Sequence, residues 1–182
     1  MQKKILTEQF IITGEINKLS LIDNNLLKKH ISKFDKPFLD DEYSYLSQYT
    51  RIEYHNHISW LQEYLRDYFL TNGYGHSLDA LYGDLQDFRF SSLKIPKNQT
   101  IFTHNHINNN NNLNSPNVSC LYCVDGECEV YFSYDNVNVK DNFWKIPLKP
   151  KSYVMFSSSL NHRIKNFNKK TINISLQFLA KT

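Results

Sequence analysis

The chain has 182 residues, of which 41% are apolar and 14% aromatic, so it can bury one hydrophobic core but not a second. Its net charge of +3 comes with lysines scattered along the sequence, which does not indicate nucleic-acid binding. Residues 1–16 lack the apolar centre of a signal peptide, and no run reaches the roughly 18 apolar residues of a membrane span. We therefore expect a single soluble, cytoplasmic domain over residues 1–182, without a membrane partner.

Residues 1–85 carry two helical patterns and are expected to form a helical support region. The first pattern, over 21–34, begins near an Asp/Asn cap and spaces its apolar residues at helical intervals. The second, over 57–75, has a longer apolar stripe and ends near Gly73, a typical helix stop. A first strand is also predicted, over residues 4–12. The apolar stripe of the second helix consists of Trp60, Leu61, Tyr64, Leu65, Phe69 and Leu70.

From residue 86 onward the apolar period changes to two, which is typical of short strands. Asp125-Gly126 lies between two of these runs and predicts a β-hairpin, because both positions of a tight hairpin turn favour positive φ. Such a series predicts a mainly β fold over 86–182, a jelly roll or double-stranded β-helix braced from outside by the helices. The strands are predicted over residues 87–95, 99–106, 118–124, 127–133, 143–146, 152–156, 161–165 and 171–179.

The three cysteines, Cys120, Cys123 and Cys128, do not predict a disulfide framework, because their number is odd and the chain is expected to be cytoplasmic. Cys120 and Cys123 have the spacing of half a zinc motif. They lie within a predicted strand, however, where residues three apart face opposite sides and cannot easily bind one ion. We expect all three to be buried in the core.

Two His-x-His pairs differ in the element that carries them. His55 and His57 lie at the start of the second helix, where residues two apart do not face each other. His104 and His106 end a predicted strand, where residues two apart project to the same face. Only the second pair therefore has the geometry to bind one ion with both imidazoles. His162, at the start of a later strand, becomes a third ligand if the two strands lie side by side.

An asparagine-rich segment, residues 107–117, follows the second pair. It is either a solvated connection or a lid over whatever the two histidines hold, since long loops beside sites often serve in that way.

The order of these motifs resembles that of the 2-oxoglutarate/Fe(II) oxygenase superfamily, and within it a group of small bacterial and phage members. In that group a His-x-His pair is followed by segments similar to VSCLYCV, MFSSSLNHRI and TINISLQF of this chain. The likeness runs over residues 88–178. The broader cupin pattern is similar too, although its usual Gly and Pro are absent. The positions that share the spacing of the second cupin motif are Lys151, Ser157, Ser159, His162 and Asn166.

The resemblance implies that His104, His106 and His162 bind Fe(II) and that 2-oxoglutarate is the cosubstrate. Its oxidative decarboxylation to succinate and CO2 usually accompanies hydroxylation of a substrate C–H bond. The commoner oxygenase pattern has an acid where His106 stands. Three neutral imidazoles leave the metal charge uncompensated, which brings the site close to three-histidine cupin dioxygenases.

A second departure concerns the cosubstrate. The final strand of the family opens with an arginine that forks onto the distal carboxylate of 2-oxoglutarate, and Thr171 occupies that position here. Lys169, Asn173 and Ser175 share the strand parity of Thr171, so they are expected to line the same pocket. Tyr122 matches a tyrosine of the family and completes the expected cosubstrate-binding set.

No carboxylate restores the missing ligand. Asp125 belongs to the predicted turn, and Glu127 and Glu129 belong to a solvated strand face. Arg163 is adjacent to His162 on a strand, so it should face away from the metal. The serines before His162 have no orienting acid, which argues against a hydrolase.

Three functions remain open. The resemblance favours a 2-oxoglutarate/Fe(II)-dependent dioxygenase acting on an unknown substrate, with N-terminal helices that support a homodimer as in many relatives. The missing arginine motivates a cupin-type three-histidine metalloprotein, a dioxygenase or isomerase, that does not use 2-oxoglutarate. The inexact motifs leave a non-catalytic jelly-roll binding module as the third.

Overall fold

The computed structural model describes residues 9–17, 23–33, 49–51, 56–71, 83–107, 116–133, 143–167 and 170–181. The helices in these ranges are α1 (Asn24–Ser32) and α3 (Asn56–Thr71). The first five strands are β1 (Ile11–Glu15), β2 (Tyr49–Arg51), β3 (Gly83–Ile95), β4 (Thr100–His104) and β5 (Val118–Asp125). The remaining five are β6 (Cys128–Ser133), β7 (Phe143–Leu148), β8 (Ser152–Ser157), β9 (His162–Lys165) and β10 (Thr171–Lys181).

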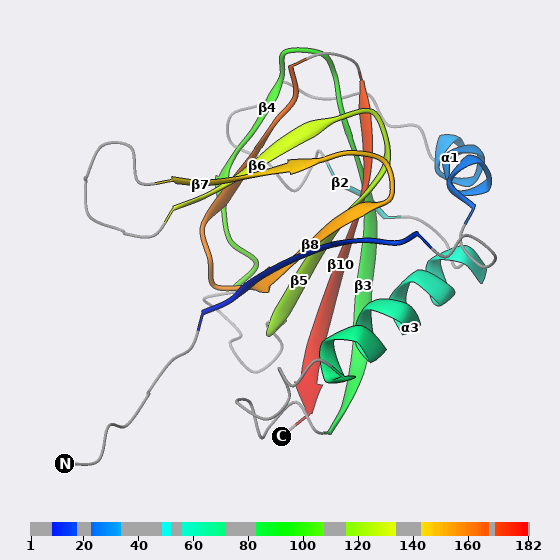
Figure 1. The fold of residues 1–182 in the computed structure, drawn as a ribbon, viewed down its shortest axis with the longest axis vertical. Coiled ribbons are helices and arrows are strands. Elements are labelled where there is room, and N and C mark those ends of the chain that lie inside the picture. Colours follow the sequence, from blue (N-terminus) through cyan, green and yellow to red (C-terminus); the bar gives the residue numbers. More distant parts are fainter. Residues whose placement is uncertain are drawn as a thin grey trace.

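The strands form two antiparallel sheets that face each other (Figure 1). The larger sheet has the order β1-β8-β5-β10-β3-β2, and the smaller has the order β4-β9-β6-β7. Apolar side chains from both sheets fill the space between them and form what we call the inner core. This is the mainly β jelly roll that the strand pattern predicts. The inner core includes Leu121, Cys123, Val130, Phe132, Val154, Phe156 and Ile164.

Both helices pack on the outer face of the larger sheet, as predicted (Figure 1). Apolar side chains of the helices and of the outer face of the sheet form what we call the outer core. In it Leu27 and Ile31 of α1 and Leu61, Leu65 and Phe69 of α3 are fully buried. β5, β8 and the first half of β10 are therefore buried on both faces, with alternate side chains in the inner and outer cores. Within the part of the chain that the structure describes, neither helix is long and apolar enough to span a membrane.

The helix boundaries follow from local chemistry. Asp23 caps α1, because its side chain accepts hydrogen bonds from the backbone N–H groups of Asn25 (2.7 Å) and Leu26 (3.3 Å). The predicted stop of the second helix at Gly73 lies outside the described residues. The first strand runs over Ile11–Glu15, and burial of Ile12 opposite Met155 fixes its register with β8. Residues 4–8 of the predicted strand over 4–12 lie outside the described residues.

The prediction of a hairpin at Asp125-Gly126 is wrong. β5 pairs with β8 and β10, whereas β6 pairs with β7 and β9 in the other sheet. The turn therefore carries the chain from one sheet to the other. Gly126 has a positive φ of 75°, but Asp125 does not, and a tight hairpin turn of the predicted type needs both. An Asp-Gly pair signals a tight turn, and it does not specify which strands will pair.

The cysteines lie as predicted. Cys120 belongs to the outer core and Cys123 to the inner core, so the two face opposite sides of β5. All three cysteines are free and buried. Burial raises the pKa of the Cys128 thiol to about 12, and it raises the pKa of the other two thiols as well. The thiols are therefore protonated at neutral pH and are poor nucleophiles and poor metal ligands.

Candidate metal centre

Two of the candidate ligands lie opposite each other on neighbouring strands. His104 is the last residue of β4, His162 is the first residue of β9, and the two pair in register. Directly paired residues of antiparallel strands project to the same face, which brings the two rings to a centroid separation of 4.3 Å. Both side chains are buried at one end of the inner core.

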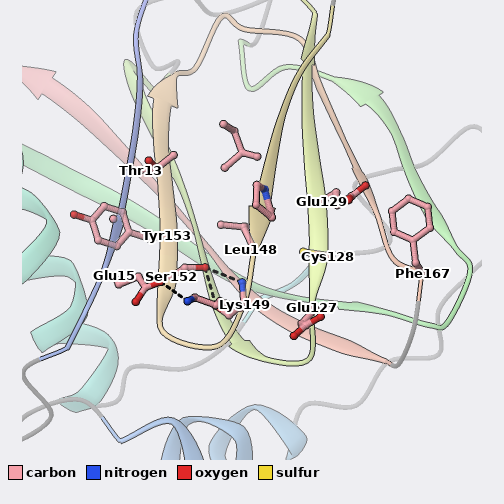
Figure 2. Close-up of a pocket in the computed structure, with 13 residues that line it drawn as sticks. Thr13, Glu15, Glu127, Cys128, Glu129, Leu148, Lys149, Ser152, Tyr153 and Phe167 are labelled. Carbon is pink, nitrogen blue, oxygen red and sulfur yellow. Dashed lines mark hydrogen bonds and ion pairs between the residues drawn. The ribbon is translucent and has the colours of Figure 1, made fainter.

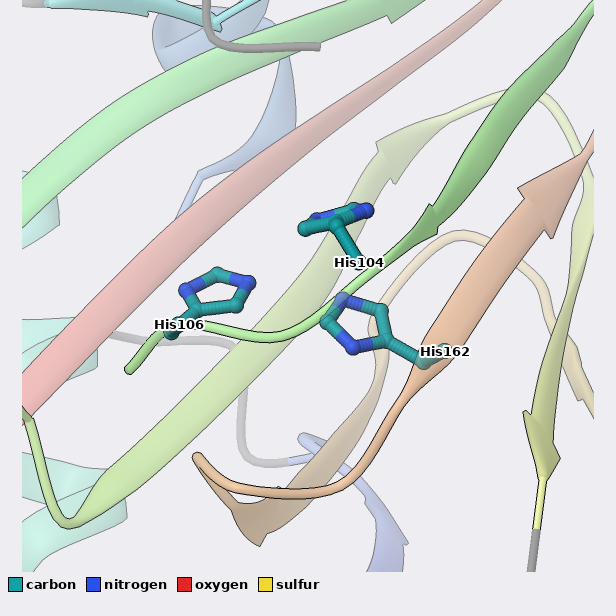
Figure 3. Close-up of side chains that lie close together, drawn as sticks. All are labelled: His104, His106 and His162. Carbon is teal, nitrogen blue, oxygen red and sulfur yellow. The ribbon is translucent and has the colours of Figure 1, made fainter. Parts of the chain in front are cut away.

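His106 joins them from beyond the end of β4 (Figure 3). Its ring centroid lies 5.3 Å from that of His104 and 5.1 Å from that of His162. The candidate ligand atoms of the three histidines all lie within 4.8 Å of one another. Strand parity alone does not bring His106 here, because it lies outside the strand. Its backbone N–H donates to the carbonyl of Ser158 (2.9 Å), which fastens the segment to the turn between β8 and β9.

The residue between the two ligands strengthens this attachment. The side-chain amide of Asn105 donates to the Oδ1 atom of Asn161 (3.1 Å), and its oxygen accepts from the backbone N–H of Ile107 (3.1 Å). The backbone around the His-x-His pair is therefore held on both sides of Asn105. Such restraint fixes ligand positions before an ion arrives, which lowers the cost of binding.

The protonation of His162 suits a metal. Its Nδ1 atom lies 3.2 Å from the carbonyl oxygen of Leu160, and a carbonyl can only accept, so Nδ1 carries the proton. The Nε2 atom then keeps its lone pair. It is buried and has no hydrogen-bond partner among the described residues. An acceptor atom buried in this way is costly unless something binds it, and a cation fits.

The electrostatic environment keeps the imidazoles neutral. Burial, followed by repulsion from His104 and His106, holds the pKa of His162 well below its usual value. Burial, followed by repulsion from His104, lowers the pKa of His106 to about 3. A metal binds the neutral form of histidine, so the residues present fit a divalent ion.

Aromatic rings wall the site on its inner side. Phe156 lies 4.7 Å from the ring of His162 and 6.2 Å from that of His106, and Phe132 lies 5.9 Å from His162. The two phenylalanines also contact each other, at 4.9 Å between centroids. Both are fully buried, so water is excluded from this side of the histidines.

Three of the residues expected to bind a cosubstrate lie on the inner face of β10. Thr171, Asn173 and Ser175 are buried and alternate with apolar residues that belong to the outer core. Asn173 donates to Oγ1 of Thr171 (3.4 Å), and its Oδ1 accepts from the thiol of Cys128 (3.7 Å). The hydroxyl of Ser175 is buried without a partner among the described residues. Lys169, the fourth of the set, lies outside them.

Tyr122 requires a correction. It pairs in register with Ile174 and belongs to the outer core, so it lies on the face of the larger sheet that is turned away from the histidines. Its hydroxyl donates to Oδ1 of Asn24 on α1 (2.6 Å), and burial raises its pKa. Tyr122 therefore anchors a helix. The family resemblance aligned Tyr122 with a tyrosine in a similar segment. Its position along β5, however, turns its side chain to the outer core.

Gln177 is a residue of the site that the sequence analysis missed. The Nε2 atom of its side-chain amide is in hydrogen-bond contact with the Nδ1 atom of His106. The alternation of side chains along the final strand indicates this position, because Gln177 lies on the same face as Ser175 and Asn173, further along the strand.

The other charged residues near these strands face outward. The guanidinium of Arg163 lies over the rings of Tyr131 (5.0 Å) and Phe143 (4.5 Å), on the side opposite His162 as predicted. Glu129 accepts from the Tyr131 hydroxyl (2.5 Å) and pairs with Lys145. In the described part of the chain the metal-ligand cluster contains histidines alone, so no carboxylate joins it.

A separate pocket of about 600 Å³ lies at the other end of β6 (Figure 2). Cys128, at the start of β6, lines it, whereas Phe132, near the end of the strand, contacts His162. Glu15 and Lys149 form an ion pair at its edge (2.7 Å). None of the three histidines lines this pocket.

Comparison with known proteins supports the fold. No family model and no curated protein matches the chain. A prolyl-4-hydroxylase from Pseudomonas putida superposes with a TM-score of 0.60 over 94% of this chain and 93% of its own, at 13% identity. At this identity the likeness shows the fold alone, a jelly roll with helical support.

Two further structures are similar only in part. A cupin superfamily protein from Desulfitobacterium hafniense gives a TM-score of 0.38 at 11% identity, over 53% of this chain and 72% of its own. Drosophila melanogaster CENP-C bound to CAL1 gives 0.39 at 10% identity, over 48% of this chain. The match spans 62% of the CENP-C chain, less than two thirds of its length.

Proposed function

We propose that this protein is an Fe(II)- and 2-oxoglutarate-dependent dioxygenase that hydroxylates a substrate still to be identified. The observation that carries the proposal is the cluster of His104, His106 and His162, whose candidate ligand atoms lie within 4.8 Å of one another. A second support is the jelly roll that carries this cluster, which superposes on a prolyl-4-hydroxylase over 94% of the chain.

The three histidines would hold the metal, and Fe(II) with 2-oxoglutarate would supply the oxidising chemistry. The chain itself contributes position and surroundings. Leu160 orients the ring of His162 through its carbonyl, and Phe132 and Phe156 exclude water from the inner side. Exclusion of water strengthens electrostatic interactions at the site and prevents side reactions.

On this proposal the inner face of β10 binds the cosubstrate. Asn173 and Ser175 offer an amide and a buried hydroxyl, and Thr171 stands where the family has its arginine. A hydroxyl that has no partner in the described structure gains a hydrogen bond when a carboxylate reaches it. Neutral donors bind a carboxylate less tightly than an arginine fork does, so we expect weak 2-oxoglutarate binding.

The neutral residues of this face, with Thr171 in place of an arginine, also favour a second candidate. It is a three-histidine metalloprotein that does not use 2-oxoglutarate. The described inner-face residues of β10 are neutral: Thr171, Asn173, Ser175 and Gln177. A site of this kind suits a substrate that chelates the metal without a distal carboxylate.

One titration tests both candidates. The protein is loaded anaerobically with Fe(II), and 2-oxoglutarate is added while the visible absorption of the iron chelate is recorded. The dioxygenase proposal predicts one equivalent of iron and a new band that saturates with 2-oxoglutarate. Iron uptake without the band would leave only the second candidate, and no iron uptake would contradict both. His57→Ala is the matched control, because His57 lies on α3, against Trp60 and away from the cluster.

A further inference from the structure

Two of the three histidines, His162 and His106, are oriented by different kinds of partner. His162 donates from Nδ1 to the backbone carbonyl of Leu160, an acceptor that cannot change its role. His106 meets the side-chain amide of Gln177 at its own Nδ1 atom, and the atom that the structure places against Nδ1 is the amide nitrogen, Nε2. An amide has an oxygen that accepts and a nitrogen that donates, and a half-turn about its last bond exchanges them. The orientation of Gln177 therefore determines the role of Nδ1 in His106.

This choice decides whether His106 can bind an ion through its other nitrogen. If the amide oxygen of Gln177 faces the ring, Nδ1 carries the proton and Nε2 keeps its lone pair. If the amide nitrogen faces the ring, as it does in the structure, Nδ1 accepts and Nε2 is protonated, so Nε2 cannot be a ligand until the amide turns. Ligating histidines almost always donate their other N–H to an oxygen, because this fixes the tautomer and raises ligand basicity.

We propose that Gln177 is the positioning residue that sets the tautomer of His106, and that its amide turns by half a rotation to present its oxygen to Nδ1 when His106 binds an ion. The inference rests on the proposed metal site and adds to it a residue of the final strand. Gln177 is well placed for the task, because β10 pairs with β5 on one side and with β3 on the other. Strand pairing on both sides holds the backbone of Gln177 in place, and a half-turn about its last side-chain bond exchanges the two amide atoms without moving that backbone.

The backbone of His106 is placed differently from those of the other two histidines. His104 and His162 lie on paired strands and are buried, whereas His106 lies beyond the end of β4 and is partly exposed. The hydrogen bond to Ser158 fixes the backbone of His106 and leaves its ring to be oriented by side chains. Gln177 makes such a contact from the facing sheet.

Two substitutions separate the polar role of Gln177 from its volume. Leucine in Gln177→Leu keeps a similar size and offers neither donor nor acceptor. In Gln177→Glu the carboxylate can only accept when ionised, so it enforces a proton on Nδ1. Gln62→Leu is the matched control, because it removes an amide from α3 on the outer face of the larger sheet.

The test measures the affinity for Zn(II) by competition with a chelating dye, together with the NMR signal of the His106 Nδ1–H in the Zn(II)-loaded protein. We expect Gln177→Leu to weaken Zn(II) binding about 10- to 100-fold and to lose the protected Nδ1–H signal. Gln177→Glu should bind at least as tightly as the natural chain, and Gln62→Leu should match it.

The outcomes are distinguishable from failure of the metal site itself. If the natural chain binds no divalent ion, the proposed function fails and the role of Gln177 fails with it. If the natural chain binds Zn(II) and Gln177→Leu binds it equally well with the Nδ1–H signal intact, Gln177 has no positioning role. A folded Gln177→Leu that loses stability alone, with affinity and signal unchanged, would also overturn the inference.

Discussion

His104 and His162 pair in register across β4 and β9, and their ring centroids lie 4.3 Å apart. This pairing positions two of the three candidate ligands, because backbone hydrogen bonds of the smaller sheet hold both residues in place. His106 is added by a segment docked on Ser158. The site therefore depends on strand register as much as on its side chains.

Replacing His162 should weaken metal binding strongly. His162→Ala removes a buried ligand whose Nε2 atom is available to an ion, and two remaining imidazoles hold a divalent ion weakly. We expect Zn(II) affinity to fall by more than about 100-fold, in line with loss of one ligand plus its orienting bond. Isothermal titration calorimetry measures this. His57→Ala should leave affinity within experimental error, and an equal loss there would show that metal binds elsewhere.

Metal-free protein should lose stability as the pH falls below about 6.5, the ordinary pKa of histidine. The pKa values of His106 and His162 are lowered in the folded state, so the unfolded chain binds more protons in acid. The stability that depends on these two neutral imidazoles is fully present above about pH 6.5. It declines as the pH falls toward 3, the pKa of His106 in the folded protein. Urea denaturation in the presence of a chelator, at several pH values, measures the slope.

A second variant tests whether the buried histidines cause this dependence of stability on pH. His162→Leu removes one titrating group and should make stability less dependent on pH between 6.5 and 4.5, whatever its effect on stability at neutral pH. An unchanged slope in His162→Leu would assign the acid sensitivity to other groups.

Ser175→Ala should have opposite effects on stability and ligand binding. The Ser175 hydroxyl is buried without a partner among the described residues, so its removal should stabilise the unliganded fold by about 1 kcal/mol. If the hydroxyl binds the cosubstrate, the same change should weaken 2-oxoglutarate binding about 10-fold. Thermal unfolding and the chelate titration give the two values. A stabilised variant with unaltered 2-oxoglutarate affinity would remove Ser175 from the binding set.

Tyr122→Phe should affect the fold and leave the site intact. It removes the hydrogen bond to Asn24, which ties α1 to β5, and we expect a loss of about 1 kcal/mol. Fe(II) and 2-oxoglutarate affinities should be unchanged, because Tyr122 lies in the outer core. A tenfold fall in 2-oxoglutarate affinity would restore the role implied by the family resemblance.

Gly126→Ala should destabilise the crossing between the sheets. Gly126 has φ of 75°, and a Cβ there would lie 2.8 Å from the carbonyl oxygen of Lys170 and 2.9 Å from Cγ2 of Thr171. The strained φ alone costs of order 1 kcal/mol, and the contact with backbone adds to it. Urea denaturation should show a loss of at least about 1 kcal/mol. Unchanged stability would mean that the turn relaxes without cost.

Alternation of side chains explains both what the sequence predicted and what it did not. It placed Asn173 and Ser175 on one face and Cys120 and Cys123 on opposite faces, and the structure agrees in both cases. The same rule puts Tyr122 on the face of Cys120, and the structure shows that this face belongs to the outer core.

Long-range pairing is what a local pattern could not supply. Asp125-Gly126 marks a tight turn, but the partners of the flanking strands are set by burial across the whole barrel. The position of His106 depends on a hydrogen bond to Ser158, far along the chain, and its contact with Gln177 depends on the packing of one sheet on the other. Neither contact follows from the spacing of neighbouring residues.

The most direct test of the central claim counts imidazole ligands on the metal. X-ray absorption spectroscopy of anaerobically Fe(II)-loaded protein should show three imidazoles on one iron in the natural chain. The count should fall in any His162→Ala that retains iron, and it should stay at three in His57→Ala. A natural chain that binds Fe(II) through fewer than two imidazoles, or through cysteine sulfur, would contradict a metal centre built from His104, His106 and His162.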